Sequence, residues 1–420
     1  MKFYIYTLGC KVNTYESNVI HDILINNGYK EDHNADIYIV NSCTVTNTAA
    51  NKTVKLVKRL RKDKQAIIIV VGCLCQDNSE LLKEYADIII GNNYKSKIID
   101  YINSYKETGK QIIEVHDLDD APFEDMSLNN FNKTRAFVKI EDGCDNYCSY
   151  CIIPYTRGTV RSKGKSNTIS EVKSLIANGH KEIVLTGIHT GHYRDGDYQF
   201  SDLLNDLVKI EGLERLRISS IEITELDDKV LDVIKNSKVI VDHLHIPLQS
   251  GSDSILVAMN RKYNINYFID KIEKIRNLRP DISITTDVIV GFPGETEENF
   301  KETIENIKKI NFTKLHVFPY SIRKGTVAAT LPNQIDIRIK KERVKTLLEL
   351  SRTLELNYMN KFINREVTFI PEIIKDGYLI GHTGNYLLIK AKGSEELINN
   401  LVKVNIKEID YPHCTGVLNS

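Results

Sequence analysis

Runs of apolar, largely β-branched residues alternate with helix-like patterns through the first part of the chain. The four runs are FYIYTLG (3–9), DIYIV (36–40), AIIIVVG (66–72) and DIIIG (87–91). A helical pattern from Tyr15 to Asn27 follows the first run, and Val54, Val57 and Leu60 mark one face of a later helix. Strands that are apolar almost throughout are typical of a parallel sheet covered on both faces. The pattern therefore predicts an α/β domain with a doubly wound parallel sheet.

A second α/β series begins after position 134. Its candidate strands are AFVKIED (136–142), EIVLTGI (182–188), RLRISSI (215–221), VDHLHIP (241–247), ISITTDVIVG (282–291) and KLHVFPY (314–320). Helical patterns separate most of them. Six such βα units predict a partial (β/α)6 barrel, with its site at the carboxyl ends of the strands.

Two further changes of pattern divide the chain. The stretch from Glu114 to Asp125 carries six acidic residues and no lysine or arginine, which indicates a linker. A long charged helix is expected over 335–362, and the short β-like runs after it predict a small C-terminal β-barrel. The expected domains are therefore 1–116, 135–362 and 363–420, with a linker at 117–134.

Three cysteines follow the first three predicted strands directly. These residues are Cys10, Cys43 and Cys73. Ligands of doubly wound sheets bind beyond the carboxyl ends of the strands, so the three thiols should converge on one edge and share a metal. The alternative is three unrelated core cysteines, since free cysteine is often buried. Cys75 competes with Cys73 as third ligand, and Cys73 is favoured because it is nearer the strand end.

A second triplet, Cys144, Cys148 and Cys151, has C-x3-C-x2-C spacing just after the first barrel strand. Three thiolates leave one position of a four-coordinate metal or a four-iron cluster open, and open positions are where metals react. The two triplets therefore suggest two [4Fe–4S] clusters, each with one free iron. The alternative is a zinc loop completed by a distant histidine or by Cys414. Zinc ligands usually come as two separated pairs, which argues against it.

Composition adds little about partners, because 56 basic residues balance 56 acidic ones. The N-terminus lacks the pattern of a signal peptide, and no apolar run is long enough to span a membrane. We therefore expect a cytoplasmic protein that makes no membrane contact, whose eight cysteines stay reduced.

Local charge suggests a nucleic-acid partner. The segment 51–64 has seven basic residues and one acidic residue, and RGTVRSKGK (157–165) has four basic residues and no acidic residue. Both follow predicted cysteine ligands and could neutralise phosphates. The alternative is that they form solvated surface, as most such runs do. The segment from Ile363 onward has six basic and seven acidic residues, so RNA binding there would need one face or stacking on Tyr378 or Tyr386.

Short motifs along the whole chain resemble those of one family. TLGCKVN, NSCTVT and VVGCLCQ are similar to the three cysteine motifs of the methylthiotransferases of the radical S-adenosylmethionine superfamily. The radical domain of that family is matched by EDGCDNYCSYCIIPYTRG, PLQSGSD, IVGFPGET and PYSIRKGT, and the C-terminal barrel resembles its RNA-binding TRAM domain. Cys75 departs from the family pattern, in which a small residue such as alanine is usual. The form TLGCKVN resembles the subgroup that modifies threonylcarbamoyladenosine in tRNA.

The resemblance implies a [4Fe–4S] cluster on each cysteine triplet. It also implies that S-adenosylmethionine is cleaved at the second cluster to a 5′-deoxyadenosyl radical, while the cluster on the first triplet carries the incoming sulfur. Tyr150 would pack near the adenine, Thr186 and Gly187 near the amino group, Gln249 and Ser250 near the ribose, and Gly291 beside the adenine end. No side chain is assigned as catalytic acid or base.

The implied activity is methylthiolation of C2 of N6-threonylcarbamoyladenosine next to the anticodon of tRNA. Its partners would be the tRNA anticodon loop, S-adenosylmethionine, an electron donor and a sulfur donor. Two alternatives stay open. The first is the same chemistry on isopentenyladenosine in tRNA or on a ribosomal protein, and the second is a non-catalytic RNA-binding protein with structural metal.

Overall fold

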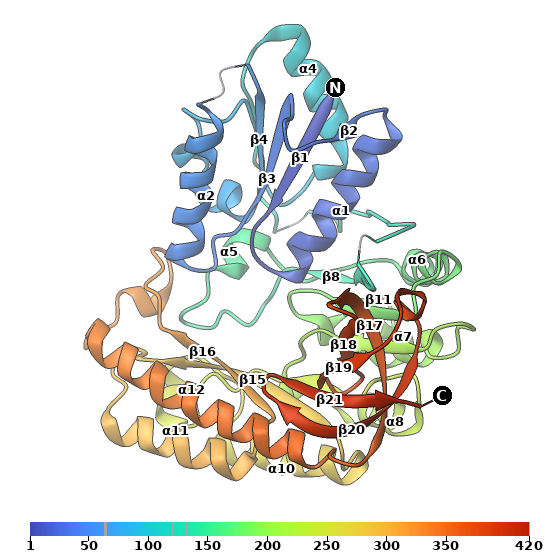
Figure 1. Ribbon diagram of the computed structural model, residues 1–420. Coiled ribbons are helices and arrows are strands. Elements are labelled where there is room, and N and C mark those ends of the chain that lie inside the picture. The colour runs from blue at the N-terminus through green and yellow to red at the C-terminus, as the bar shows by residue number, and fades with distance from the viewer. Residues whose placement is uncertain (63–64, 120, 132, 420) are drawn as a thin grey trace.

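Six parallel strands form the sheet of the N-terminal domain in the computed structural model, which describes residues 1–62, 65–119, 121–131 and 133–419 (Figure 1). In sheet order they are β2 (Lys30–Glu31), β1 (Lys2–Thr7), β3 (Ile37–Ser42), β4 (Ile67–Gly72), β5 (Ile88–Ile90) and β6 (Ile112–Glu114). The four predicted strands are confirmed. The edge strands β2 and β6 were not predicted, because they are only two and three residues long.

Helices cover both faces of this sheet, as the doubly wound prediction requires. The helices α1 (Lys11–Asn26) and α4 (Ile98–Thr108) pack on one face, and α2 (Asn47–Leu60) and α3 (Cys73–Asn78) pack on the other. Alternate residues of the central strands point to opposite faces, so Ile69 contacts the first helix pair and Val70 the second.

The central domain contains the six predicted barrel strands, all parallel. One group is β7 (Arg135–Lys139), β10 (Glu182–Thr186) and β13 (Arg215–Ile218), and the other is β14 (His243–His245), β15 (Ser283–Val290) and β16 (Lys314–Pro319). A single bridge between Leu216 and Ile240 joins the two groups. The outer helices that contribute to the core are α6 (Lys165–Ala177), α7 (Phe200–Leu207), α8 (Asp228–Asn236), α10 (Ile265–Leu278) and α11 (Glu297–Ile310). The partial (β/α)6 barrel is therefore confirmed.

The chain ends in a closed five-stranded barrel that follows the long helix α12 (Ile337–Asn360) (Figure 1). Its strands are β17 (Glu366–Lys375), β18 (Tyr378–Thr383), β19 (Leu388–Lys392), β20 (Val402–Asp410) and β21 (His413–Leu418). The last strand was not predicted, and it holds Cys414 fully buried in the apolar core of this barrel. Cys414 is thus a core residue, which removes it as a fourth metal ligand for the loop at 144–151.

The segment 117–134 has no helix or strand in its described residues, but it is packed against the neighbouring domains. Its apolar side chains Met126, Leu128 and Phe131 are buried in the core of the central domain. The hydroxyl of Tyr15 on α1 donates to the carbonyl of Met126 (2.5 Å) and to a carboxylate oxygen of Glu171 (2.9 Å), so the segment helps to hold the first domain against the barrel. Among the described residues, no helix has both the length and the apolar character needed to cross a bilayer.

Candidate active site

The first cysteine group lies at one edge of the N-terminal sheet. Cys10 is the N-cap residue of α1, Cys43 follows β3, and Cys73 opens α3 directly after β4. Because β1, β3 and β4 are adjacent and parallel, their carboxyl ends meet at this edge. A Cβ added to Gly9, which has a φ of +104°, would lie 2.9 Å from the Cβ and 3.1 Å from the Sγ of Cys43. Glycine at this position therefore allows the Cys10 loop to approach Cys43.

Asn13 fixes the loops that carry Cys10 and Cys43. Its side-chain amide donates to the carbonyls of Leu8 (2.7 Å) and Ser42 (2.8 Å), one on each loop. Burial raises the pKa of the Cys43 thiol to about 11, and it also raises that of Cys10. Thiols bind metal as thiolates, so iron binding here would be coupled to release of protons.

Cys75 has different surroundings from Cys73. Its thiol is buried with Val40, Val70 and Leu74 in the apolar layer between the sheet and the helices, where burial raises its pKa to about 12. Its Sγ lies 4.0 Å from the hydroxyl of Ser42, whereas the Sγ of Cys73 lies 3.8 Å from the amide oxygen of Asn92. These contacts favour Cys73 as third ligand, which stays a prediction.

Replacing Cys73 by alanine should remove about four irons per chain, the content of one cubane cluster. Replacing Cys75 by alanine should leave the iron content unchanged, because its thiol is part of an apolar core. Iron analysis of both anaerobically reconstituted variants, with circular dichroism to confirm folding, checks this. The reverse pattern of iron loss would assign the third ligand to Cys75.

The second cysteine group occupies a loop that follows β7 and the short strand β8 (Glu141–Asp142). The N–H of Cys144 donates to the carbonyl of Gly158 (3.0 Å), and Gly143 has a φ of +89° at a point where a Cβ would lie 1.9 Å from the carbonyl oxygen of Thr159. Only glycine fits there, so the loop must fold back on the segment that follows it.

Two of the three thiols of this loop have polar side chains as neighbours. The Arg261 guanidinium donates to the Sγ of Cys148 (3.3 Å), and the Sγ of Cys144 lies 3.8 Å from Nδ1 of His189. Burial raises the pKa of Cys151 to about 12 and that of Cys144 further. His189 is a neighbour that the sequence reasoning missed. Its position directly after the predicted strand 182–188 was the available signal.

The predicted cofactor-binding residues fall into two groups. Thr186 and Gly187 line a large cavity, and a Cβ on Gly187 would lie 2.7 Å from a carboxylate oxygen of Glu141. That carboxylate is buried and accepts the N–H groups of Ile188 (2.8 Å) and His189 (2.6 Å), and burial raises its pKa well above the usual value.

The other four residues are not among the described residues that line this cavity. Tyr150 packs against the cluster of Phe292 and Tyr320, and the N–H of Gly291 donates to the Glu295 carboxylate (3.0 Å). Gln249 has a φ of +65°, and the Ser250 hydroxyl lies 3.4 Å from that of Thr303. Their roles toward S-adenosylmethionine stay predictions.

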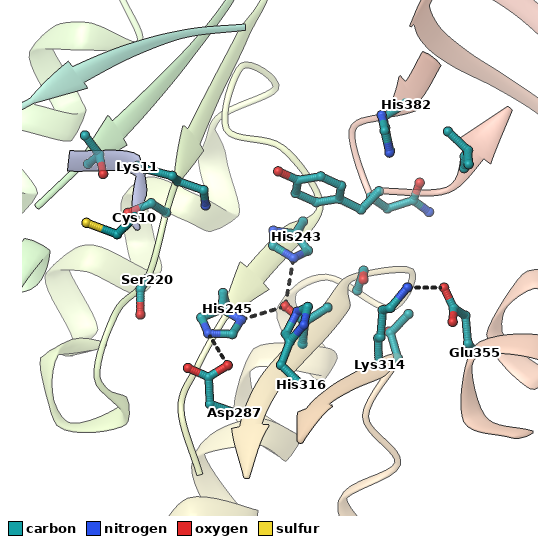
Figure 2. Close-up of a pocket in the computed structure, with 18 of the residues that line it drawn as sticks. Cys10, Lys11, Ser220, His243, His245, Asp287, Lys314, His316, Glu355 and His382 are labelled. Carbon is teal, nitrogen blue, oxygen red and sulfur yellow. Dashed lines mark hydrogen bonds and ion pairs between the residues drawn. The ribbon is translucent and has the colours of Figure 1, made fainter. Parts of the chain in front are cut away.

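The cavity has a volume of about 990 Å³, and residues of all three domains line it (Figure 2). Cys10, Lys11 and Val45 come from the first domain, and Ile153, two residues beyond Cys151, comes from the loop of the second cysteine group. Barrel-strand residues, from Thr186 at a carboxyl end to Ser283 and Lys314 at amino ends, and the 382–388 region of the C-terminal barrel complete the wall. A single, partly open cavity is thus lined by Cys10 of the first cysteine group and by Ile153 beside the second.

Histidines at the barrel mouth line this cavity and were not assigned by the sequence reasoning (Figure 2). Nε2 of His243 and Nδ1 of His245 lie 3.1 and 3.0 Å from the hydroxyl of Thr285, and Nε2 of His245 lies 3.4 Å from the carboxylate of Asp287. Burial, followed by the charge of Arg217, lowers the pKa of His243 well below its usual value. The H-x-H alternation in VDHLHIP was the available signal, because alternate strand residues share a face.

The C-terminal barrel docks on the central domain through two buried arginines of β13. Arg215 donates to the carbonyls of Thr368 (2.7 Å) and His382 (3.1 Å), and Arg217 donates to that of Gly384 (3.0 Å). The Tyr386 ring lies 3.9 Å from the Arg217 guanidinium and forms part of the cavity wall. Tyr386 is thus packed at a domain contact, whereas Tyr378 is partly exposed on the barrel surface.

The basic run at 157–165 is only partly accessible: Lys165 is exposed and Arg161 is half-buried, and a phosphate contact of these two stays a prediction. Arg157 and Lys163 are fully buried, and each is ion-paired: Arg157 with Asp142 (3.0 Å) and Glu16 (3.2 Å), Lys163 with Glu171 (2.6 Å). Burial and pairing leave these two residues unable to reach a phosphate. The run at 51–64 differs, because Lys52, Lys55, Lys58 and Arg59 are exposed on α2; Asp63 and Lys64 lie outside the described residues.

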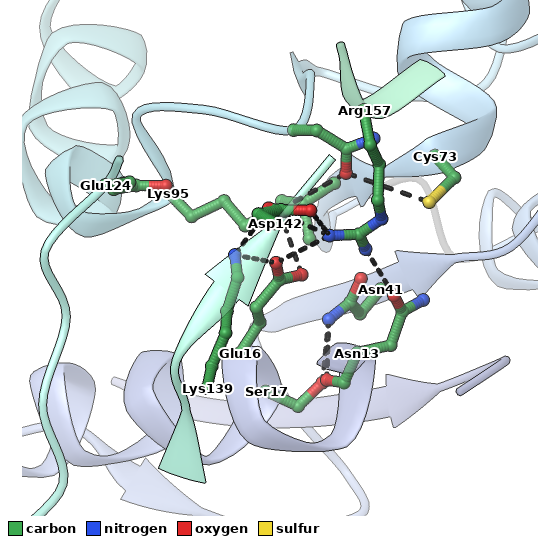
Figure 3. Close-up of polar contacts among 12 residues, drawn as sticks. Asn13, Glu16, Ser17, Asn41, Cys73, Lys95, Glu124, Lys139, Asp142 and Arg157 are labelled. Carbon is green, nitrogen blue, oxygen red and sulfur yellow. Dashed lines mark hydrogen bonds and ion pairs between the residues drawn. The ribbon is translucent and has the colours of Figure 1, made fainter. Parts of the chain in front are cut away.

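Arg157 joins the two halves of the site (Figure 3). It ends helix α5 (Ile153–Arg157), which directly follows the second cysteine loop, and its guanidinium donates to the amide oxygen of Asn13 (2.8 Å) in the first domain. Arg323 makes a second contact between the two domains. Its guanidinium donates to Asp77 and Thr44 at 2.6 Å each, close to Cys43. These contacts therefore hold together the two domains that carry the cysteine groups, on either side of the cavity.

A partial parallel barrel with a three-cysteine loop after its first strand defines a radical S-adenosylmethionine enzyme. Residues 138–307 match the family model described as radical SAM superfamily, and residues 2–91 match that described as uncharacterized protein family UPF0004. Among solved structures, the radical S-adenosylmethionine methyltransferase TsrM from Kitasatospora setae has a similar fold, with a TM-score of 0.59 and 12% identity over 78% of this chain and 73% of that chain.

Curated relatives identify the family of this chain within the superfamily. It is 41% identical to the threonylcarbamoyladenosine tRNA methylthiotransferase MtaB of Bacillus subtilis, over 98% of this chain and 95% of the relative. It is 38% identical to the protein of that name from Thermotoga maritima, over 96% and 94%. It is also 36% identical to the tRNA-2-methylthio-N(6)-dimethylallyladenosine synthase of Carboxydothermus hydrogenoformans, over 99% of both chains. The chain belongs to the methylthiotransferase family of radical S-adenosylmethionine enzymes, and this membership implies a [4Fe–4S] cluster and S-adenosylmethionine.

Proposed function

We propose that this enzyme methylthiolates C2 of N6-threonylcarbamoyladenosine in the anticodon loop of tRNA, using two [4Fe–4S] clusters. The observation that carries the proposal is the single cavity that adjoins both cysteine groups, in a chain 41% identical to an MtaB protein. We assign its domains as 1–116, 135–362 and 363–420, with the connecting segment at 117–134.

The residues present fit two such clusters. Cys144, Cys148 and Cys151 would hold one cluster and Cys10, Cys43 and Cys73 the other, since each set supplies three thiol ligands from loops that neighbouring hydrogen bonds fix. When bound, the clusters supply reductive cleavage of S-adenosylmethionine and a carrier for sulfur. Thr186 and Gly187, beside the Glu141 carboxylate, would orient the methionine end of S-adenosylmethionine.

The chain's own residues position the base and exclude water. An anticodon-loop nucleotide is unstacked more easily than a paired one, so it can enter a pocket. The cavity would receive the adenine with C2 directed between Cys10 and the strand end at Thr186. The exposed basic face of α2 begins just after Val45, a cavity-lining residue, and would contact the RNA backbone. An electron donor and a sulfur donor are further partners of this reaction.

Expression of the chain in a bacterial strain that lacks its own threonylcarbamoyladenosine methylthiotransferase tests the function. We expect 2-methylthio-N6-threonylcarbamoyladenosine to reappear in tRNA hydrolysates analysed by mass spectrometry. A strain that lacks the isopentenyladenosine enzyme serves as the parallel arm and should show no restored methylthio group. Restoration in that arm alone would reassign the substrate. Failure in both arms, with the iron-loaded protein present, would contradict tRNA methylthiolation.

A further inference from the structure

One lysine of the cavity has no hydrogen-bond or ion-pair partner among the described residues. Lys11 and Lys314 are the lysines that line it (Figure 2). The ammonium of Lys314 is paired with the Glu355 carboxylate at 2.9 Å. The ammonium of Lys11 has no hydrogen bond or ion pair with any residue in the described part of the chain, although the side chain is largely withdrawn from solvent.

The two arginines whose charges act on Lys11 are ion-paired, and neither is among the described residues that line the cavity. Arg135 is paired with Glu372 (3.2 Å), and Arg217 is paired with Glu182 (2.8 Å) and covered by the Tyr386 ring. An ammonium that is partly removed from water and unpaired raises the free energy of the folded protein, and a bound anion offsets this increase. Lys11 is therefore the cavity group best suited to receive a negative charge.

The position of Lys11 points to the substrate. It follows Cys10 directly, so its side chain leaves the same loop that faces the cavity. In the proposed function, C2 of the adenine is directed between Cys10 and Thr186, and the N6 substituent must occupy the remaining cavity. The threonylcarbamoyl substituent ends in a carboxylate, whereas an isopentenyl substituent carries no charge.

We infer that Lys11 binds the carboxylate of the threonylcarbamoyl group and so determines the specificity for an anionic N6 substituent. The inference rests on the proposed function, because it concerns recognition of that substrate. The loss of a charge-assisted hydrogen bond in a partly desolvated site weakens binding by about tenfold to a hundredfold. An uncharged substituent would gain nothing from Lys11.

The test measures binding of anticodon stem-loop RNAs to the iron-loaded enzyme under anaerobic conditions. Three RNAs differ only at the modified adenosine, which carries threonylcarbamoyl, its uncharged threonine-amide analogue, or no substituent. The wild type should bind the first RNA at least about tenfold more tightly than the amide. Lys11→Gln should reduce that ratio to about twofold or less, and Lys11→Arg should retain most of it. Lys229→Gln removes an exposed charge on α8 and should leave the ratio unchanged.

Iron content and S-adenosylmethionine affinity of each variant complete the test. Lys11→Gln should keep both at the wild-type level. An equal loss for all three RNAs would indicate a phosphate contact, a loss of S-adenosylmethionine affinity would indicate the cofactor carboxylate, and a loss of iron would indicate a role in the cluster site. Each of these outcomes overturns the inference. If instead the wild type modifies isopentenyladenosine tRNA and not threonylcarbamoyladenosine tRNA, the proposed function fails.

Discussion

Replacing Cys148 by alanine is expected to abolish product formation and to lower the iron content from about eight to about four per chain, one cubane cluster's worth. The loop then offers two thiols instead of three, and Cys414 cannot replace the lost ligand, because it is in the core of the C-terminal barrel. The Arg261 guanidinium, which donates to this sulfur at 3.3 Å, also loses one of its acceptors, while Tyr263 and Glu222 remain. Iron analysis, the visible absorption of the reconstituted protein and mass spectrometry of tRNA nucleosides measure the effect.

Cys75→Ala is the matched control for this experiment, because it removes a buried thiol that we do not assign to either cluster. Its iron content and product yield should stay near the wild-type values. Wild-type product from Cys148→Ala would show that the loop at 144–151 does not hold the cluster on which activity depends. The four irons that remain would belong to the first cysteine group, so the variant also reports on the number of clusters.

Glu16→Gln is expected to destabilise the protein by about 3–5 kcal/mol, the usual effect of breaking a buried ion pair from one side. The Glu16 carboxylate is fully buried and binds three cations: Lys95 (2.9 Å), Lys139 (2.9 Å) and Arg157 (3.2 Å) (Figure 3). Asp142 is the other carboxylate that faces Lys139 and Arg157, so the variant leaves three buried cations against one anion. The midpoint of urea unfolding measures the loss.

This network also crosses the interface between the first two domains. Glu16 and Lys95 come from the N-terminal domain, and the other three residues come from the central one. The variant should therefore unfold with a separate early transition of the N-terminal domain. Asp32→Asn, which breaks an exposed pair with Lys2, is the control and should change the midpoint little. A midpoint unchanged in Glu16→Gln would contradict the role assigned to the network.

The pH dependence of stability provides a second readout of the same variant. Burial alone would raise the pKa of Glu16, but Lys139, Lys95 and Arg157 hold it well below its usual value. A carboxylate with a lowered folded-state pKa contributes stability above its unfolded-state value of about 4.3, and that stability is lost as the pH falls. The wild type should therefore lose more stability than Glu16→Gln between about pH 5 and pH 3.

Much of this architecture could be predicted from local pattern. The ten predicted strands of the first two domains are present because apolar β-branched runs are recognisable without tertiary information. The edge strands β2 and β6 and the final strand β21 were missed. The first two are too short for a periodic signal, and β21 exists because it pairs in parallel with β19 and antiparallel with β20, partners that only the closed barrel supplies.

Whether an individual charged residue is buried or exposed could not be predicted from local pattern. The runs at 51–64 and 157–165 look alike in composition, yet the first presents exposed lysines on α2 and the second buries Arg157 and Lys163. The partner that Arg157 meets in the first domain, Glu16, lies 141 positions earlier in the chain. Lys11, in contrast, is the cavity lysine that the described fold leaves without a partner.

The sequence by itself determined the sheet, the barrel and the placement of two cysteine groups at strand ends, because the carboxyl ends of parallel strands necessarily share one edge. Only the tertiary structure decided that one cavity adjoins both groups, that histidines and Lys11 line it, and that Arg157 joins the domains. The physical reason is that burial and pairing of a charge depend on groups brought from distant parts of the chain, which no local pattern records.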